Sequence, residues 1–307
     1  METIWPLTER RNSIKSTIDR LAHRVKRTPG FCNICGKFTI FKTHVAGFRE
    51  HVECSRCGSR NRQRQIASVL MSYALDRNQK PTELVDYLGS GPASRRARRG
   101  PSHRYMASVK DLPKDIVVWN TETTRAFHAS LKSHLDSNYV STEFIDPSLV
   151  SGDVLNGVMH GDIQNSHFSD DSLDFMISGD VFEHIPFPDK AISESYRILK
   201  PGGCHIFTAP FYHHRFTNER RASLRDDGTV EQHMKPWYHD DPMRPEGALV
   251  FNIFAPELLC MMEKQGFEVR LLKLHSPLYG IYGQNAIVLV ARKTMPSASQ
   301  RDAVFMD

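Results

Sequence analysis

Four cysteines in the N-terminal third of the chain have the spacing of a metal site. Cys32 and Cys35 form one Cys-x-x-Cys pair, Cys54 and Cys57 form a second, and 18 residues separate the pairs. Two cysteines three positions apart in a tight turn can direct both sulfurs at one ion, and this arrangement is typical of a structural Cys₄ zinc site. A glycine follows each pair and permits the backbone angles of such a turn. We therefore expect a zinc ribbon whose four ligands leave no coordination position open.

Two alternatives to four-cysteine zinc remain at this stage. The pairs could be reduced, redox-active cysteines or an iron centre, and His44 or His51, which lie between the pairs, could replace one ligand. Six cysteines are too few for a disulfide framework in 307 residues. Cys204 and Cys260 lie in apolar stretches, so we expect both to be buried thiols.

Charge is distributed unevenly along the sequence. Residues 1–110 hold 22 Lys and Arg against 8 Asp and Glu, whereas the remainder is acidic and the whole chain has net charge +5. A basic segment can attract a polyanion, and Arg60, Arg62 and Arg64 beside the ribbon could contact phosphate or nucleic acid. The same three arginines could equally form the first turn of a helix, and a solvated basic surface is the simpler interpretation of the charge. The arginines of residues 95–99 are expected in a solvated loop.

Strand and helix signals alternate in the acidic part of the chain. Leu173–Ile177 is a short apolar run typical of a buried strand, Pro188–Leu199 has helical spacing, and Cys204–Ala209 is another apolar run. Between them, Lys-Pro-Gly-Gly is expected to end the helix, with Gly202 and Gly203 in left-handed conformations. Strand, helix and strand in this order form the unit of a parallel sheet.

The stretch from Asp162 to Gly203 carries a family resemblance. It contains Asp, then Ser-Leu-Asp-Phe, then Val-Phe-Glu-His, then Arg-Ile-Leu-Lys-Pro-Gly-Gly, in that order. This pattern resembles class I S-adenosylmethionine-dependent methyltransferases, type 11-like, over roughly residues 116–292. The resemblance implies an α/β, Rossmann-like sheet with helices on both faces, S-adenosylmethionine as cofactor and methyl transfer as the reaction.

The family's glycine-rich cofactor loop has two candidate positions. Residues 89–91 read Gly-Ser-Gly, but they lie too far upstream of Glu143, the acid expected at the end of the second strand. Glu122 lies 21 residues before Glu143, which fits one strand–helix–strand step through a helix over residues 125–135. We therefore take Ile116–Trp119 as the first strand. The loop after it has no glycine, so a catalytically inactive binding or scaffold module is an alternative.

The resemblance also implies a donor site at the carboxyl ends of the strands. Glu143 would bind the ribose hydroxyls, and Asp162 with the backbone of Ile163 would bind adenine. Residues 178–180 would contact the methionine side, as would the loop after the first strand. The predicted cofactor-binding residues are Thr121, Glu122, Glu143, Asp162, Ile163, Ser178, Gly179 and Asp180.

An insert over residues 211–251 is expected to cover the same sheet edge on the acceptor side. It is rich in histidine, aromatic and acidic residues, which suit acceptor recognition and proton removal. His184, His233 and His239 are the candidate bases. A second metal site built from His233, His239 and Asp240 is one alternative, and a histidine-rich surface loop is another.

These observations predict the following organisation. A basic helical segment spans residues 1–30, the zinc ribbon 31–64, a helix with a basic linker 65–110, the methyltransferase domain 111–293 and a disordered tail 294–307. The expected acceptor is a small molecule or a carrier-linked metabolite, and RNA is the alternative. No apolar run is long enough to span a membrane and no secretory signal is recognised, so we expect a cytoplasmic protein without a membrane partner. The sequence leaves the oligomeric state open.

Overall fold

The structure is a computed structural model. It describes residues 26–43, 52–75, 106–241, 243–282 and 287–294. His44, His51, the Gly-Ser-Gly of residues 89–91, the arginines of residues 95–99 and nearly all of the expected N-terminal segment and C-terminal tail lie outside these ranges.

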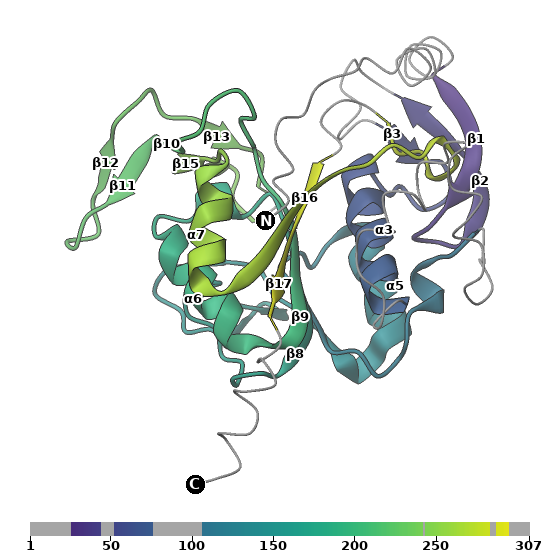
Figure 1. Cartoon of the computed structure of the whole chain (residues 1–307), viewed down its shortest axis with the longest axis horizontal. Helices are drawn as coiled ribbons and strands as arrows, with labels where there is room; N and C mark the ends of the chain where they lie inside the picture. The colour runs from purple at the N-terminus through teal and green to yellow at the C-terminus, as the bar shows by residue number, and fades with distance from the viewer. Residues whose placement is uncertain (1–25, 44–51, 76–105, 242, 283–286, 295–307) are drawn as a thin grey trace, which may run out of the picture.

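A six-stranded mixed sheet forms the centre of the molecule, in the order β16-β17-β9-β8-β4-β5 (Figure 1). β4 pairs in parallel with β5 and β8, and β8 pairs in parallel with β9, whereas β17 runs antiparallel to β9 and β16. The expected first strand is thereby confirmed, although β4 begins at Val118 and extends to Asn120. The strands are β4 (Val118–Asn120), β5 (Tyr139–Ser141), β8 (Leu173–Gly179), β9 (Leu199–Thr208), β16 (Phe267–Lys273) and β17 (Ile287–Lys293).

Helices cover both faces of this sheet, which confirms the Rossmann-like arrangement. Neighbouring strand residues alternate between two cores: Val118 and Ile177 join one, and Trp119 and Met176 join the other. Figure 1 shows α3 and α5 on one side of the sheet and α6 and α7 on the other. The helices are α3 (Asn61–Leu75), α5 (Arg125–Leu135), α6 (Pro188–Ile198) and α7 (Glu257–Gln265).

The Lys-Pro-Gly-Gly segment behaves differently from its expected role as a simple helix stop. α6 ends at Ile198 and β9 already begins at Leu199, so these four residues form an irregular start of the strand. Gly202 has a positive φ of 84°, but Gly203 does not. A Cβ at Gly203 would lie only 2.9–3.1 Å from three backbone oxygens. Glycine is therefore needed there for close approach to β8 rather than for a left-handed turn.

The ribbon is a three-stranded antiparallel sheet, β1-β2-β3. Its strands are β1 (Arg27–Cys32), β2 (Lys37–Thr43) and β3 (Val52–Cys54), so the ribbon begins upstream of residue 31. Gly36 and Gly58 have φ of 68° and 71°, as expected for the turns after the cysteine pairs. Buried ribbon side chains belong to the same core cluster as α3 and one face of the central sheet. The ribbon is therefore part of the main core.

The buried guanidinium of Arg64 joins the ribbon to the rest of the molecule. It donates hydrogen bonds to the carbonyl oxygens of Val52 (2.8 Å), Tyr279 (2.8 Å) and Gly280 (3.0 Å), and also to that of Ser59. Burial lowers the pKa of Arg64 to about 10, which still leaves it charged at neutral pH. A buried cation needs this many acceptors, so Arg64 fixes α3, the ribbon and the segment around η6 (Pro277–Tyr279) in one arrangement.

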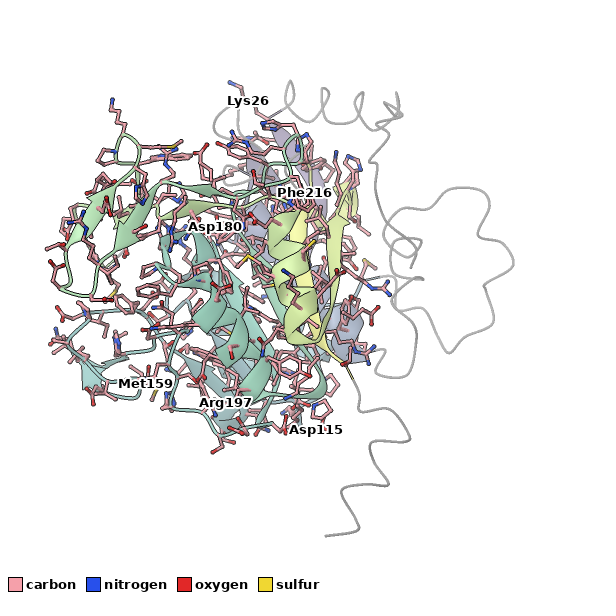
Figure 2. All side chains as sticks on the ribbon, turned by 60° about the vertical axis from the view of Figure 1, so that its left-hand side comes forward. Lys26, Asp115, Met159, Asp180, Arg197 and Phe216 are labelled. Atoms are coloured by element: carbon pink, nitrogen blue, oxygen red, sulfur yellow. The ribbon has the colours of Figure 1, made fainter. Side chains whose placement is uncertain are left out.

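The insert consists of short strand pairs at one end of the sheet. β10 pairs with β15, β11 with β12 and β13 with β14. Figure 2 labels Asp180 at the end of the sheet that faces this insert, whereas Asp115 and Arg197 lie at the opposite end. The carboxyl ends of the parallel strands therefore lie next to the insert. The strands are β10 (Glu219–Arg220), β11 (Ala222–Leu224), β12 (Val230–Gln232), β13 (Tyr238–His239), β14 (Ala248–Leu249) and β15 (Asn252–Ile253).

Short elements complete the described chain. They are η3 (Val109–Asp111), η4 (Asp136–Asn138), η5 (Phe182–His184), and the hairpin of β6 (Val154–Leu155) and β7 (Val158–Met159). Among the described helices, none combines the length and apolarity that crossing a membrane requires.

Candidate functional site

The loop after β4 is held in shape without glycine. The amide of Asn120 donates to the carbonyl oxygen of Glu122 (3.2 Å) and to the hydroxyl oxygen of Tyr139 (2.9 Å), while the Thr121 N–H donates to Ile177 O (3.0 Å). The Thr121 hydroxyl is buried and has no hydrogen-bond partner within the described residues. An unpaired buried hydroxyl is costly unless a ligand satisfies it, so this loop fits the polar part of a cofactor.

Glu143 lies beside this loop, just after β5. Its Oε1 accepts hydrogen bonds from the backbone N–H (2.8 Å) and the hydroxyl (2.9 Å) of Thr123. Burial raises the pKa of Glu143 above its ordinary value. Within the described residues both hydrogen bonds of this carboxylate go to Oε1, which leaves Oε2 for a ligand.

Arg62, at the start of α3, reaches across the carboxyl end of β8. Its Nε lies 3.4 Å from Asp180 Oδ2, and a Cβ at Gly179 would collide with its Nη1. Glu122 lies near the Arg62 guanidinium and accepts a hydrogen bond from the Gln63 side chain (2.9 Å). The pKa of Glu122 is raised, mainly because the side chain is buried. The sequence predicts Glu122 and Asp180 as donor-site residues, and it leaves Arg62 either as a phosphate contact or as part of the first turn of a helix.

Two non-glycine residues with positive φ flank this region. Arg125, the first residue of α5, has φ of 69°, and Asp180 has φ of 58°. The Asp180 carboxylate accepts a hydrogen bond from Thr208 (2.9 Å), which helps to hold its backbone. Such conformations persist where the surroundings fix them, and they are frequent at ligand sites.

Ser178 and Asp162 have local partners. The Ser178 hydroxyl is 2.8 Å from Nε2 of the buried His205, whose pKa burial lowers to about 3, so this serine side chain faces the core. Asp162 Oδ1 accepts from the backbone and side chain of Gln164 (2.8 and 3.1 Å), which closes a turn, and Ile163 is buried next to it. The proposed adenine contacts therefore lie on a well-held turn after the His160 bridge to Glu143.

On the acceptor side, the fold brings two of the three candidate bases together. His184 Nε2 lies 3.8 Å and His239 Nδ1 lies 3.4 Å from Oε1 of Glu183. His233 is elsewhere, in the β11–β12 hairpin, where its Nε2 is 2.8 Å from the Ser223 hydroxyl. The alternative metal site of His233, His239 and Asp240 is therefore wrong, because these side chains do not come together.

The four ribbon cysteines do form a cluster. Their sulfur atoms lie within 4.8 Å of one another, and Cys32 Sγ is 3.8 Å from Cys57 Sγ. The Ser59 hydroxyl lies 3.3 Å from each of these two sulfurs, and the Thr39 hydroxyl lies 3.3 Å from that of Cys54. Four converging thiols with hydroxyl groups behind them fit a structural zinc ion, which prefers thiolate ligands in tetrahedral geometry.

The three arginines beside the ribbon do not form an exposed patch. Arg64 is fully buried, Arg62 faces Asp180 across a 3.4 Å contact, and Arg60 lies 3.6 Å from Glu53. The interpretation as the first turn of a helix is confirmed, because α3 begins at Asn61. All three side chains are engaged within the protein.

Comparison with known proteins identifies the domain. Residues 124–207 match the family model described as a methyltransferase domain. The match begins in the loop after β4 and ends in β9, so it includes Glu143, Asp162 and residues 178–180 but not Arg62, Thr121 or Glu122. Residues 124–207 are therefore similar to a methyltransferase domain, in the part of the chain where the motifs after Asp162 predicted one. No curated protein matches the sequence.

Many solved structures have a similar fold at low identity. An S-adenosylmethionine-dependent methyltransferase from Mesorhizobium loti is 12% identical, with 59% of this chain and 94% of that chain covered and a TM-score of 0.38. A Methanosarcina mazei methyltransferase is 17% identical, with coverages of 60% and 95% and a TM-score of 0.33. The Burkholderia thailandensis 1,6-didemethyltoxoflavin-N1-methyltransferase is 14% identical, with coverages of 58% and 71% and a TM-score of 0.36.

Proposed function

We propose that the protein transfers a methyl group from S-adenosylmethionine to a small or carrier-linked acceptor bound between the sheet edge and the insert. The observation that carries this proposal is the cluster of Thr121, Glu143, Arg62 and Asp180 at one edge, with a buried, unpaired hydroxyl among them. The cofactor, when bound, supplies an activated methyl group on a sulfonium. The protein's own contribution is to hold the cofactor and the acceptor, to orient them toward each other and to exclude water from between them.

On the donor side, each residue has a separate role. Oε2 of Glu143 would accept from the ribose hydroxyls while Thr123 holds Oε1 in place. Asp162 and the backbone of Ile163 would contact the adenine. The guanidinium of Arg62 would bind the carboxylate of the methionine part, since it already lies over Gly179 at the end of β8.

On the acceptor side, aromatic side chains accompany the histidines. Trp237 and Tyr238 are 42% and 51% exposed, and the Trp237 ring packs edge-on against His239 with centroids 5.0 Å apart. Exposed aromatic rings next to a polar cluster suit a ring-bearing or amphipathic acceptor. Glu183, His184 and His239 would act together where the acceptor loses its proton.

The arginine contacts favour this acceptor class over RNA. The RNA alternative rested on the ribbon, on the positive charge of residues 1–110 and on the arginines beside the ribbon, and of these Arg60, Arg62 and Arg64 are all held by internal partners. A polyanion-binding surface needs cations that face solvent. Absence of binding to a short single-stranded RNA at low salt is the expected result.

Calorimetric titration with S-adenosylhomocysteine tests the donor site. The wild-type protein is expected to bind it, and Glu143→Ala and Arg62→Ala are expected to weaken binding about tenfold to hundredfold, because each removes charge-assisted hydrogen bonds of about 1.5–3 kcal/mol. Asp146→Asn is the matched control, because this exposed carboxylate accepts hydrogen bonds from Ser148 and, within the described residues, from no other group. Glu143→Ala that binds as tightly as the control would overturn the ribose assignment.

A further inference from the structure

The carboxylate of Glu183 has an unusual environment. The residue is 0% exposed, and neither carboxylate oxygen has a hydrogen-bond partner within the described residues. The imidazole rings of His239 and His184 face this carboxylate. His239 Nδ1 lies 3.4 Å and His184 Nε2 lies 3.8 Å from Glu183 Oε1, and both distances are longer than a normal hydrogen bond. A buried carboxylate without partners costs several kcal/mol, so such groups are normally paired, protonated or bound to a metal.

The ring of His184 is oriented for coordination rather than for a hydrogen bond to Glu183. Its Nδ1 is 2.8 Å from the carbonyl oxygen of Leu249. A carbonyl can only accept, so Nδ1 carries the hydrogen and the neutral ring has its lone pair on Nε2. This nitrogen faces Glu183 Oε1. A backbone carbonyl that holds the second nitrogen is the usual support of a metal-bound histidine.

His239 reaches the same point from the insert. β13 pairs with β14, with His239 opposite Ala248, and the same two-strand unit supplies the Leu249 carbonyl that holds His184. The Phe251 N–H donates to the Glu183 carbonyl oxygen (2.8 Å), which ties the end of this unit to η5. Two of the three side chains are thus fixed by the fold of the insert against η5.

We propose that Glu183, His184 and His239 bind a divalent transition-metal ion. One ligand atom from each residue lies within 4.8 Å of the others. An ion about 2.1 Å from each ligand requires ligand atoms roughly 3–3.5 Å apart, close to the observed 3.4 Å and 3.8 Å. Two imidazoles and one carboxylate suit zinc, iron(II) or manganese. The ion would compensate the buried charge that the protein leaves unpaired.

Three protein ligands leave at least one coordination position open. An open position is what distinguishes a catalytic from a structural metal site. Glu183 lies three residues after Asp180, at the same edge of the sheet. The ligand expected at the open coordination position is water or an oxygen atom of the acceptor. A metal-bound hydroxyl loses its proton more readily. This consequence rests on the proposed methyl transfer, whereas metal binding itself does not.

Zinc uptake by the full-length protein tests the proposal. The protein is dialysed against a chelator, the chelator is removed, and ZnCl₂ is titrated by calorimetry with zinc per chain counted by elemental analysis. The wild-type chain should take up one zinc more than His239→Ala. His233→Ala, a histidine of the same insert that bonds Ser223, should match the wild type. Glu183→Gln, which keeps the shape of the side chain, should also lose the additional zinc.

The outcomes separate the proposal from its alternatives. Equal zinc uptake by the wild type and His239→Ala would overturn it, and so would a loss of uptake in His233→Ala as large as that in His239→Ala. Circular dichroism of each variant separates ligand loss from unfolding. Failure of S-adenosylhomocysteine binding would contradict the proposed function while leaving the zinc result intact.

Discussion

The Cys₄ cluster of the ribbon and the Glu183–His184–His239 cluster of the acceptor side differ in how the chain builds them. The ribbon cluster draws all four ligands from two tight turns within residues 32–57, and hydroxyl groups of Ser59 and Thr39 already surround the sulfurs. The second cluster joins η5 to β13, which is more than fifty residues further along the chain. The first is closed and local, whereas the second is open and assembled by the tertiary fold.

This difference implies different roles. The closed cluster shares its core with α3 and the central sheet, so a metal ion bound there would contribute to folding of the whole molecule. The open cluster contains a buried, unpaired carboxylate next to the donor edge, an arrangement that a stability role does not require. The free energy of unfolding can be measured for variants of both clusters and of their surroundings. The expected changes are largest for the loss of a ribbon ligand and smallest for the replacement of one titratable carboxyl group.

The largest effect is expected for Cys54→Ser. Removing one thiolate should abolish tight zinc binding and lower the free energy of unfolding by about 5 kcal/mol or more, because the ion holds a segment too small to fold alone. Since Cys54 and Val118 belong to one core cluster, near-UV circular dichroism should report loss of tertiary packing in the sheet as well. Cys260→Ser, at a half-buried position in α7, is the control and should retain zinc and nearly all stability. An intact sheet in zinc-free Cys54→Ser would show that the ribbon is an independent module.

Arg64→Met is expected to have the next largest effect. The variant removes a buried guanidinium whose hydrogen bonds satisfy the carbonyls of Val52, Tyr279 and Gly280. Loss of such a partner typically costs about 3–5 kcal/mol, whereas loss of a surface ion pair costs less than about 1 kcal/mol. Arg60→Ala, which has its 3.6 Å contact with Glu53, is therefore the matched control in urea denaturation. Equal stability of the two variants would contradict the role of Arg64 in joining the ribbon to the core.

The same contrast explains what sequence alone could predict. Cysteine spacing and the motifs between Asp162 and Gly203 are local, so the ribbon and the parallel core of the sheet were predictable from them. The sequence could not predict which of the three arginines beside the ribbon point into the core. Several cations at the start of a helix do not reveal which side chains are buried. The sequence therefore left open whether Arg64 contacts phosphate or belongs to the first turn of a helix, and the structure confirms the helix.

The acceptor side was harder to predict for a related reason. The sequence indicated His184, His233 and His239 as equals, and only the strand pairing of the insert separates His233 from the other two. Glu183 was missed because burial without a partner is a property of the folded state. The adjacent Glu-His pair near a histidine-rich insert was the available signal.

A zinc-dependent gain in stability is expected at the open cluster. With zinc at about a hundredfold excess over its dissociation constant, the open cluster should add about 2.7 kcal/mol to the free energy of unfolding of chelator-treated wild type, beyond the gain that zinc at the ribbon supplies. His239→Ala should gain only the ribbon contribution, and His233→Ala should gain as much as the wild type. Thermal unfolding with and without ZnCl₂ provides the measurement. Equal gains in His239→Ala and the wild type would assign the whole effect to the ribbon cysteines.

The smallest effect is expected for Glu143→Gln, which compares the half-buried carboxylate of Glu143 with the buried carboxylate of Glu183. Thr123 donates two hydrogen bonds to Glu143, whereas Glu183 accepts none within the described residues. Burial raises the pKa of Glu143 in the folded protein. A raised folded pKa contributes stability below the unfolded pKa, and this contribution is lost as pH rises through the folded pKa. The glutamine variant lacks this loss, so its stability relative to wild type should increase from acidic to neutral pH.

Asp146→Asn provides a control of opposite sign for this last prediction. Hydrogen bonds from Ser148 lower the pKa of Asp146, so its contribution is present above the unfolded pKa and disappears as pH falls through the folded pKa. Removing it should therefore cost more stability at neutral than at acidic pH. Urea denaturation of both variants between acidic and neutral pH tests the pair. If both differences changed with pH in the same direction, burial would not be what distinguishes Glu143, and the expectation that Glu183 needs a cation would lose its physical basis.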